Sequence, residues 1–224
     1  MLSSTLIPDL DNANEGRIAS FWCAQIGCTL FFRKGMTQMK IETKKLTLSA
    51  VMIALSAVLS LVKVYELPLG GSITLLSMLP VAVIAICYGT KWGLFCSTLY
   101  AFVQIALDAG KLMGYGMTAG TWAGCLMFDY IIAFGALGLA GLFRKKGTIG
   151  MCSGITLALV IRFISHFISG SIVFSVFCPE GWNVFFYSFC YNGSYMLPEL
   201  IITIIGAVLL FRIPQVSKLI EEKQ

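Results

Sequence analysis

Charged residues are scarce in this chain. Only 12% of its 224 residues are Asp, Glu, Lys or Arg, whereas 58% are hydrophobic and the mean hydropathy is +0.85. So few charged side chains cannot cover the surface of a water-soluble globule, which excludes an ordinary soluble domain. A membrane-spanning helix needs ~20 mainly apolar residues, so this length allows about six spans with short loops. The composition therefore predicts an all-α integral membrane protein with one membrane domain.

Signals for metal, disulfide or nucleic-acid chemistry are also missing. The eight cysteines include no CxxC pair, and five of them fall in or beside apolar runs, where a thiol behaves as a small hydrophobe. A single histidine offers no metal-ligand cluster and has no nucleophile motif beside it, so an intramembrane enzyme is poorly supported. The net charge of +5 comes from residues at the ends of apolar runs, which are topology signals rather than a nucleic-acid surface. We expect neither a cofactor nor a metal.

Six apolar runs predict the membrane helices, with Gly-rich and Pro-containing segments between them as loops. They cover residues 46–62, 76–88, 92–107, 121–143, 149–177 and 185–211. If the helices alternate in direction, most Lys and Arg residues near helix ends fall on one side of the membrane. The positive-inside rule then places both termini in the cytoplasm and the first, third and fifth loops outside.

Four ionisable residues stand inside the expected spans: Asp129, Arg162, His166 and Glu199. An Asp or Arg at the bilayer centre costs about 2.5 kcal/mol or more, so these side chains should face protein, water or ligand. Helix lengths place Asp129 and His166 in the outer half of the membrane. Arg162 lies one turn deeper than His166, and we interpret it as a structural residue that pairs with Glu199.

The outer layer gains two more polar residues, because the sixth span begins outside and carries Tyr187 and Asn192 in its first turns. Together with Asp129 and His166 they indicate a pocket for a small solute. The alternative for His166 is a core histidine bonded to a backbone carbonyl. Nearby aromatic residues either form an interfacial belt or stack on a planar cation; they are Tyr115, Trp122, Tyr130, Phe174, Trp182 and Tyr191.

Small residues follow one face of the first span, at Ala50, Ala54 and Ala57, with Ser49 beside them. Small side chains at four-residue spacing let another helix approach closely. Alanine is common in membrane spans, so this signal alone is weak.

Several ordered motifs resemble the ThiT family, the thiamine-specific S components of energy-coupling factor (ECF) transporters. The resemblance extends from about Thr47 to Phe211. The motifs that carry it are GSITL at 71–75, DYIIAF at 129–134, RFISHFISG at 162–170, CPEG at 178–181 and YSFCYNGSYMLPE at 187–199.

The resemblance implies an S-component fold of six transmembrane helices in the bacterial plasma membrane. It further implies high-affinity capture of thiamine from outside and delivery to a transmembrane coupling subunit, EcfT, with two ATPase subunits, as part of an ECF-type ABC importer. This chain would then be a transport subunit rather than an enzyme, because ATP hydrolysis belongs to the partners. An S component for another vitamin and a stand-alone secondary transporter remain the alternatives, although no internal repeat typical of the latter is evident.

The resemblance also implies roles for individual residues. The ligand site would contain Asp129, Tyr130, His166, Gly170, Phe174, Tyr187 and Asn192, with Tyr115, Trp122 and Trp182 as further aromatic contacts. Ala50 and Ala54 would contact the coupling subunit. Two positions depart from the family pattern: Asp129 stands where Glu is usual, which shortens the reach of the carboxylate by one methylene, and Phe174 stands where a stacking Trp is usual.

The first residues differ in character from the rest, and we interpret residues 1–38 as an N-terminal extension before a single six-helix membrane domain at 39–224. Back-translation of residues 8–16 permits a nucleotide sequence that resembles the 3′ part of the thiamine pyrophosphate riboswitch. We hypothesise that an untranslated leader lies in the reading frame and that the native start is Met36 or Met39. An ordinary variable terminus is the alternative, and the nucleotide sequence of the gene decides between them.

Overall fold

The computed structural model of the protein describes residues 42–223. The predicted N-terminal extension, with both candidate start residues, lies outside this range. The described residues from Leu48 onward form one compact unit.

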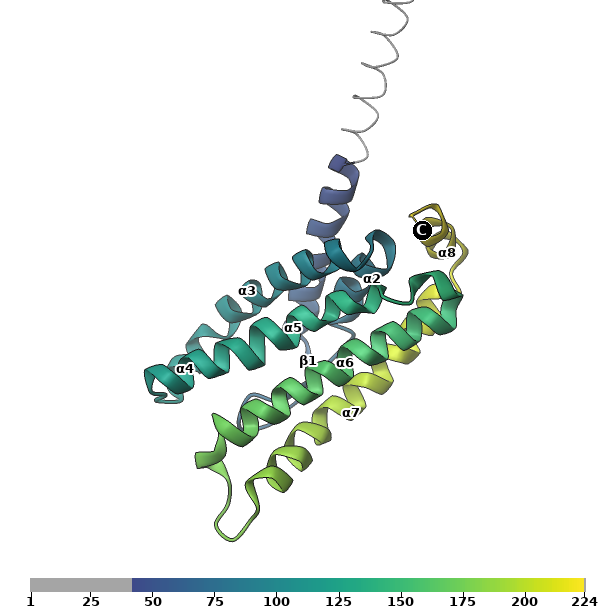
Figure 1. Ribbon diagram of the computed structural model, residues 1–224. Helices are drawn as coiled ribbons and strands as arrows, with labels where there is room; N and C mark the ends of the chain where they lie inside the picture. Colours follow the sequence, from purple (N-terminus) through teal and green to yellow (C-terminus); the bar gives the residue numbers. More distant parts are fainter. Residues whose placement is uncertain (1–41, 224) are drawn as a thin grey trace, which may run out of the picture. The chain divides into compact units, whose positions relative to one another are not determined.

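Six apolar helices make up most of the fold (Figure 1). Five are long and apolar enough to cross a membrane, and the sixth is short. They are the first helix (Glu42–Leu61), α2 (Leu79–Tyr88), α3 (Thr90–Gly114), a composite helix (Ala119–Gly141), α6 (Gly147–Ile172) and α7 (Val184–Phe211). The prediction of an all-α membrane protein with six helices is confirmed in type and approximate number.

The short helix α2 lies at the centre of the fold. Every residue from Leu79 to Cys87 is buried, as expected for a helix that is apolar on all sides. It packs against α3, the C-terminal half of the composite helix and α8 (Pro214–Lys223). Gly89 ends α2 with a φ of 89°, a conformation that glycine adopts without strain, and so allows α3 to start at once in a new direction.

The composite helix changes its hydrogen-bonding pattern along its length. It begins as the α-helix α4 (Ala119–Cys125), continues as the π-helix η1 (Leu126–Ile132), passes through α5 (Ala133–Gly135) and ends as the 3₁₀-helix η2 (Ala136–Gly141). A π-helical turn within a longer helix is rare and occurs frequently at functional sites. Asp129 lies in the middle of this turn.

Three features were not predicted from the sequence. A small antiparallel hairpin, β1 (Lys63–Glu66) with β2 (Ser72–Thr74), occupies the first predicted outer loop, with Glu66 opposite Ser72. The C-terminal helix α8 buries Ile220. Helix α3 continues to Gly114 rather than ending near Leu107, because Asp108 and Lys111 face other protein groups instead of marking the end of the apolar helix.

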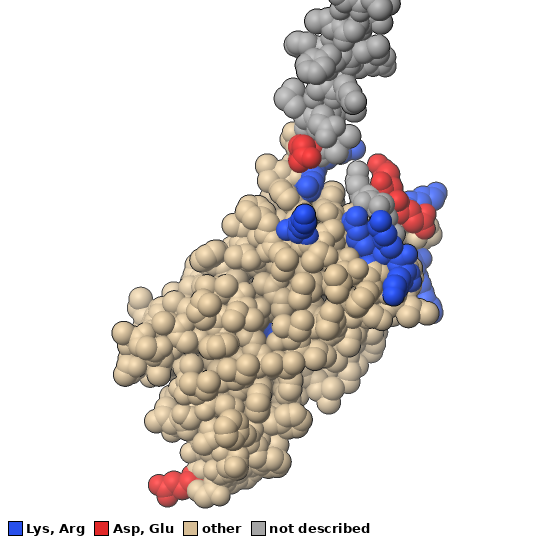
Figure 2. All heavy atoms as spheres, viewed as in Figure 1, with Lys and Arg blue, Asp and Glu red and all other residues tan. Residues whose placement is uncertain are grey.

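The outer surface of the helices is apolar, as lipid contact requires. Large exposed hydrophobic residues follow the outer faces of α3 and α7. In Figure 2 the body of the molecule is almost free of charge, whereas Lys and Arg gather at one end, around α8 and the turn that leads into α6. This separation of charge is typical of a membrane protein with one basic side.

Candidate functional site

A cavity of about 260 Å³ lies between the β1–β2 hairpin, α3, η1, α6 and α7. This volume is close to the lower end of the range for small-molecule sites. Its wall combines aromatic rings with a small number of polar and charged groups, the usual composition of a site that recognises one small ligand.

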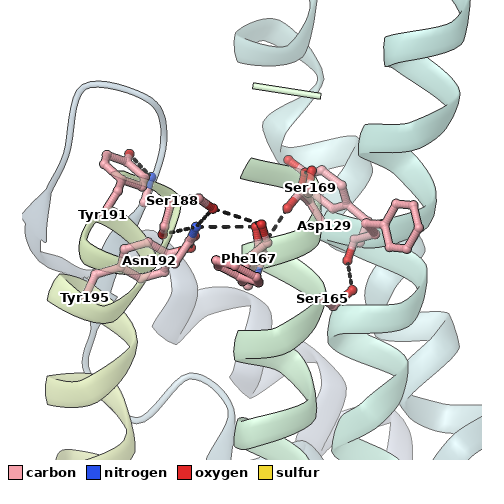
Figure 3. A network of polar contacts seen from close by, with 12 residues as sticks. Asp129, Ser165, Phe167, Ser169, Ser188, Tyr191, Asn192 and Tyr195 are labelled. Carbon is pink, nitrogen blue, oxygen red and sulfur yellow. Dashed lines mark hydrogen bonds and ion pairs between the residues drawn. The ribbon is translucent and has the colours of Figure 1, made fainter. Parts of the chain in front are cut away.

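Asp129 lines the cavity and belongs to the network of polar contacts drawn in Figure 3. One oxygen of its carboxylate lies 2.7 Å from His166 Nδ1, and the other accepts a hydrogen bond from Ser169 Oγ. A carboxylate only accepts, so the hydrogen of the imidazole is on Nδ1. In the neutral imidazole Nε2 is then an acceptor, and it is buried without a hydrogen-bond partner among the described residues. The core-histidine alternative, a bond from the imidazole to a backbone carbonyl, is not what the structure has.

The π-helical turn fixes where Asp129 points. Ser165 Oγ of α6 donates to the Phe128 carbonyl at 2.6 Å, so a serine from the neighbouring helix bonds the backbone directly beside Asp129. Ser165, His166 and Ser169 thus hold the turn from one face of α6, at spacings of one and three to four residues.

Asn192 joins α6 to α7 at the same level (Figure 3). Its Nδ2 donates to the Ser188 carbonyl at 2.9 Å and lies 3.3 Å from the His166 carbonyl, and its Oδ1 accepts from Tyr195 OH at 2.7 Å. The two helices approach closely at Gly170, because a Cβ at this position would collide with Ser188 Oγ. Because Gly170 has no side chain, α6 and α7 can approach closely there, and Gly170 itself lines the cavity.

The aromatic residues of the cavity hold one another in fixed positions. Tyr115 and Phe174 meet edge to face, with ring centroids 5.8 Å apart. Tyr187 and Tyr191 lie 6.0 Å apart at a shallow angle. Tyr130 OH donates to Asp108 Oδ2 at 3.2 Å, which ties its ring to α3.

The predicted pair of Arg162 and Glu199 is wrong: among the described residues the two form no ion pair. Glu199 instead accepts from the backbone N–H of Thr74 at 2.8 Å and from its hydroxyl at 2.6 Å, which fastens the hairpin to α7. The guanidinium of Arg162 lies 3.9 Å from the centroid of the Phe134 ring. The prediction was wrong because the partner of Glu199 is Thr74, in a hairpin that could not be recognised from the sequence.

Arg162 belongs to the cavity rather than beneath it. It is 6% exposed, and its Nε and Nη1 have no hydrogen-bond partner among the described residues. Its depth, one helical turn below His166, suggested a separate role. One turn is only ~5.4 Å, however, a distance that an arginine side chain spans.

The hairpin covers the cavity from one side. The backbone N–H of Gly71 donates to Tyr191 OH at 3.2 Å, and Glu66 forms ion pairs with Lys63 at 2.9 Å and with Lys111 of α3. Hydrogen bonds from Lys111 and then Lys63 lower the pKa of Glu66 below its ordinary value. Both lysines line the cavity wall on this side.

Eight of the ten residues predicted to contact ligand line this one cavity: Tyr115, Asp129, Tyr130, His166, Gly170, Phe174, Tyr187 and Asn192. Trp122 and Trp182 are not among its lining residues. Trp122 packs against the hydrophobic core, and Trp182 is 54% exposed beside Phe186. The predicted partner residues Ala50 and Ala54 are both exposed on the first helix.

The sequence interpretation missed Ser169 and Tyr195, which bond Asp129 and Asn192 directly. Helical spacing could have found both. Ser169 is three residues after His166, and Tyr195 is three after Asn192, so each shares a helix face with a residue that had been recognised. No comparable signal exists for the hairpin residues, because their place depends on the folding of the loop.

The family model and the two relatives that match this sequence are described as thiamine transporters. A family model described as thiamine transporter protein (Thia_YuaJ) matches residues 46–218. The thiamine transporter ThiT of Bacillus subtilis is 34% identical over 176 residues, which cover 72% of this chain and 87% of that protein. The thiamine transporter ThiT of Lacticaseibacillus paracasei is 28% identical over 151 residues, covering 62% of this chain and 73% of that protein.

The fold has a solved counterpart. The structure of ThiT from Listeria monocytogenes superimposes with a TM-score of 0.64 and covers 78% of this chain and 97% of that one. The sequence identity is 22%, so this likeness concerns the arrangement of the helices.

Proposed function

The chain belongs to the thiamine transporter (Thia_YuaJ) family, and on this premise we propose that its cavity is the thiamine site of an S component in an ECF-type ABC importer. The subunit captures thiamine from outside and delivers it to a coupling subunit and two ATPases. Both termini lie in the cytoplasm, which the position of the basic residues supports.

The observation that carries the proposal is the Asp129 carboxylate, held between His166 and Ser169 inside an aromatic cavity. Thiamine contains a permanently cationic thiazolium ring and an aminopyrimidine. A carboxylate offsets the cation and still has lone pairs that accept from the amino group. Aromatic walls favour planar cations through the negative faces of their rings.

Two unpartnered groups fit the other polar atoms of thiamine. His166 Nε2 is a buried acceptor and matches the N–H donors of the amino group. The free N–H groups of Arg162 match the acceptor nitrogens of the pyrimidine ring. A buried polar group without a partner is costly, so a ligand that satisfies both groups gains binding energy that an apolar ligand does not.

The exposed alanines of the first helix support the proposed coupling interface. Ala50 and Ala54 leave a flat surface on which a helix of the coupling subunit can pack closely.

Mass spectrometry of the ligand released from the purified, denatured protein tests the substrate directly. Thiamine is the expected ligand, and a different vitamin in its place would refute the thiamine assignment. Reconstitution in liposomes tests the coupling: uptake should require ATP, the coupling subunit and the ATPases together. Uptake by this chain alone, driven by an ion gradient, would identify a secondary transporter.

A further inference from the structure

A second concave surface lies on the outside of the bundle, away from the ligand cavity. This α6–α7 groove is lined by residues at the N-terminal end of α6 and the C-terminal half of α7, namely Thr148, Ile149, Cys152, Ser153, Thr156, Leu157, Val160, Ile204 and Val208. Two hydroxyls in it are already used, because Ser153 donates to the Ile149 carbonyl and Thr156 to the Cys152 carbonyl. The groove is therefore effectively apolar.

Basic residues surround one end of the groove. Lys145 and Lys146 directly precede α6, and Arg212 directly follows α7; all three are exposed. Arg212 continues the face of Ile204 and Val208 at four-residue spacing. This end belongs to the region where Lys and Arg gather in Figure 2. No Asp or Glu occurs in residues 144–160 or 200–213, although Figure 2 shows acidic residues at the same end, around α8.

The length of the groove matches one lipid leaflet. Thr148 to Val160 spans about 18 Å at ~1.5 Å per helical residue. Half of a bilayer's hydrocarbon core is about 15 Å thick. An acyl chain that lies along the groove thus reaches from the middle of the membrane to the level of the basic residues, where a lipid headgroup lies.

We propose that the α6–α7 groove binds an anionic phospholipid, with an acyl chain along the groove and the phosphate at Lys145, Lys146 and Arg212. Basic pockets beside membrane helices recognise anionic headgroups in this way. The site is independent of thiamine binding, and it would fix the depth of α6 and α7 in the bilayer.

Native mass spectrometry of the full chain in a neutral detergent tests the proposal. The protein is titrated with phosphatidylglycerol or with phosphatidylcholine that has the same acyl chains. One basic residue beside an anionic headgroup strengthens binding about fivefold. We therefore expect phosphatidylglycerol to be retained at least about fivefold better. Equal retention of the two lipids by the wild-type protein would overturn the proposal.

Matched variants locate the site. Lys145→Gln/Lys146→Gln should remove most of the preference for phosphatidylglycerol, whereas Lys91→Gln/Lys218→Gln, which removes two exposed charges outside the groove, should retain it. If both double variants lost the preference for phosphatidylglycerol equally, the preference would come from general attraction between charges. That result would refute a specific site.

The apolar part of the site needs its own variant. Ser153→Phe fills the groove from an exposed position and should lower retention of both lipids, whereas Ile201→Phe, on an exposed part of α7 outside the groove, should not. Glycerol phosphate, which has no acyl chain, should not compete. Competition by it, or unchanged retention in Ser153→Phe, would indicate a simple phosphate site and contradict the lipid assignment.

Discussion

The substitution Asp129→Asn removes one charge from the cavity and keeps the shape of the side chain. In the wild-type protein this carboxylate accepts from His166 and Ser169. The single amide oxygen of Asn accepts from only one of these two donors, and the amide nitrogen, itself a donor, then faces the other one. Thiamine loses the anionic partner of its thiazolium, so the variant should bind thiamine more weakly while it still inserts into the membrane.

The size of the effect follows from two estimates. A hydrogen bond to a charged group contributes ~1.5–3 kcal/mol. An ion pair at ~4 Å with an effective dielectric constant of ~20 contributes ~4 kcal/mol. The affinity should therefore fall between about tenfold and about a thousandfold.

Isothermal titration calorimetry with the purified, thiamine-free protein measures this fall. Asp129→Glu restores the charge and should recover most of the affinity. Glu180→Gln, which removes a charge from an exposed outer loop, should bind as the wild type does. A thiamine analogue with a neutral ring in place of the thiazolium should lose less affinity on Asp129→Asn than thiamine does, because only the hydrogen-bonding part of the effect remains. Wild-type affinity of Asp129→Asn for thiamine would refute the assignment of this carboxylate to the cation.

Three further outcomes are expected. His166→Ala should weaken thiamine binding at least about tenfold, because it removes the Nε2 acceptor and frees Asp129; unchanged affinity of the purified variant would contradict its role. Ala50→Trp should bind thiamine normally but impair uptake by the reconstituted transporter, and normal uptake would exclude this face from the interface. At pH values above the ordinary glutamate pKa of ~4.3, the ion pair between Glu66 and Lys111 holds the hairpin to α3. Because the folded pKa is lowered, this ion pair is lost as the pH falls through it, so amide exchange of the hairpin, compared with that of α2, should rise on acidification in wild type but not in Glu66→Gln.

Much of the site could be predicted because its residues lie on regular helices. The spacing of charged and amide residues along the spans, combined with the depth of each helix, brought Asp129, His166 and Asn192 to one level, where the structure has them. This reasoning needs only the rise per residue and the direction of each span. It works wherever a polar residue in lipid has to face the protein interior.

The rest depended on features that periodicity does not encode. The hairpin forms from a segment without a clear alternating pattern, and its Thr74 takes the carboxylate that had been assigned to Arg162. The aromatic residues of outer loops were ambiguous for the same reason: Tyr115 ends α3 and reaches the cavity, whereas Trp182 lies in a loop and faces away. The α8 helix is too polar to be recognised by hydropathy, although it buries Ile220 against the rest of the fold.

The π-helical turn at Leu126–Ile132 makes the binding site sensitive to a deletion of one residue within this segment. A π turn contains one residue more than a regular helix needs at that place, so deletion of one residue would restore regular bonding and lengthen the α-helix. The flanking halves of the helix would keep their orientation, because a π turn accommodates its extra residue locally, but the side chains within the turn would point in new directions. Asp129 would then turn away from His166 and Ser169. Engineering that stabilises this helix by making it regular thus works against the binding site, and a gap within residues 126–132 in a relative would mark a change of ligand.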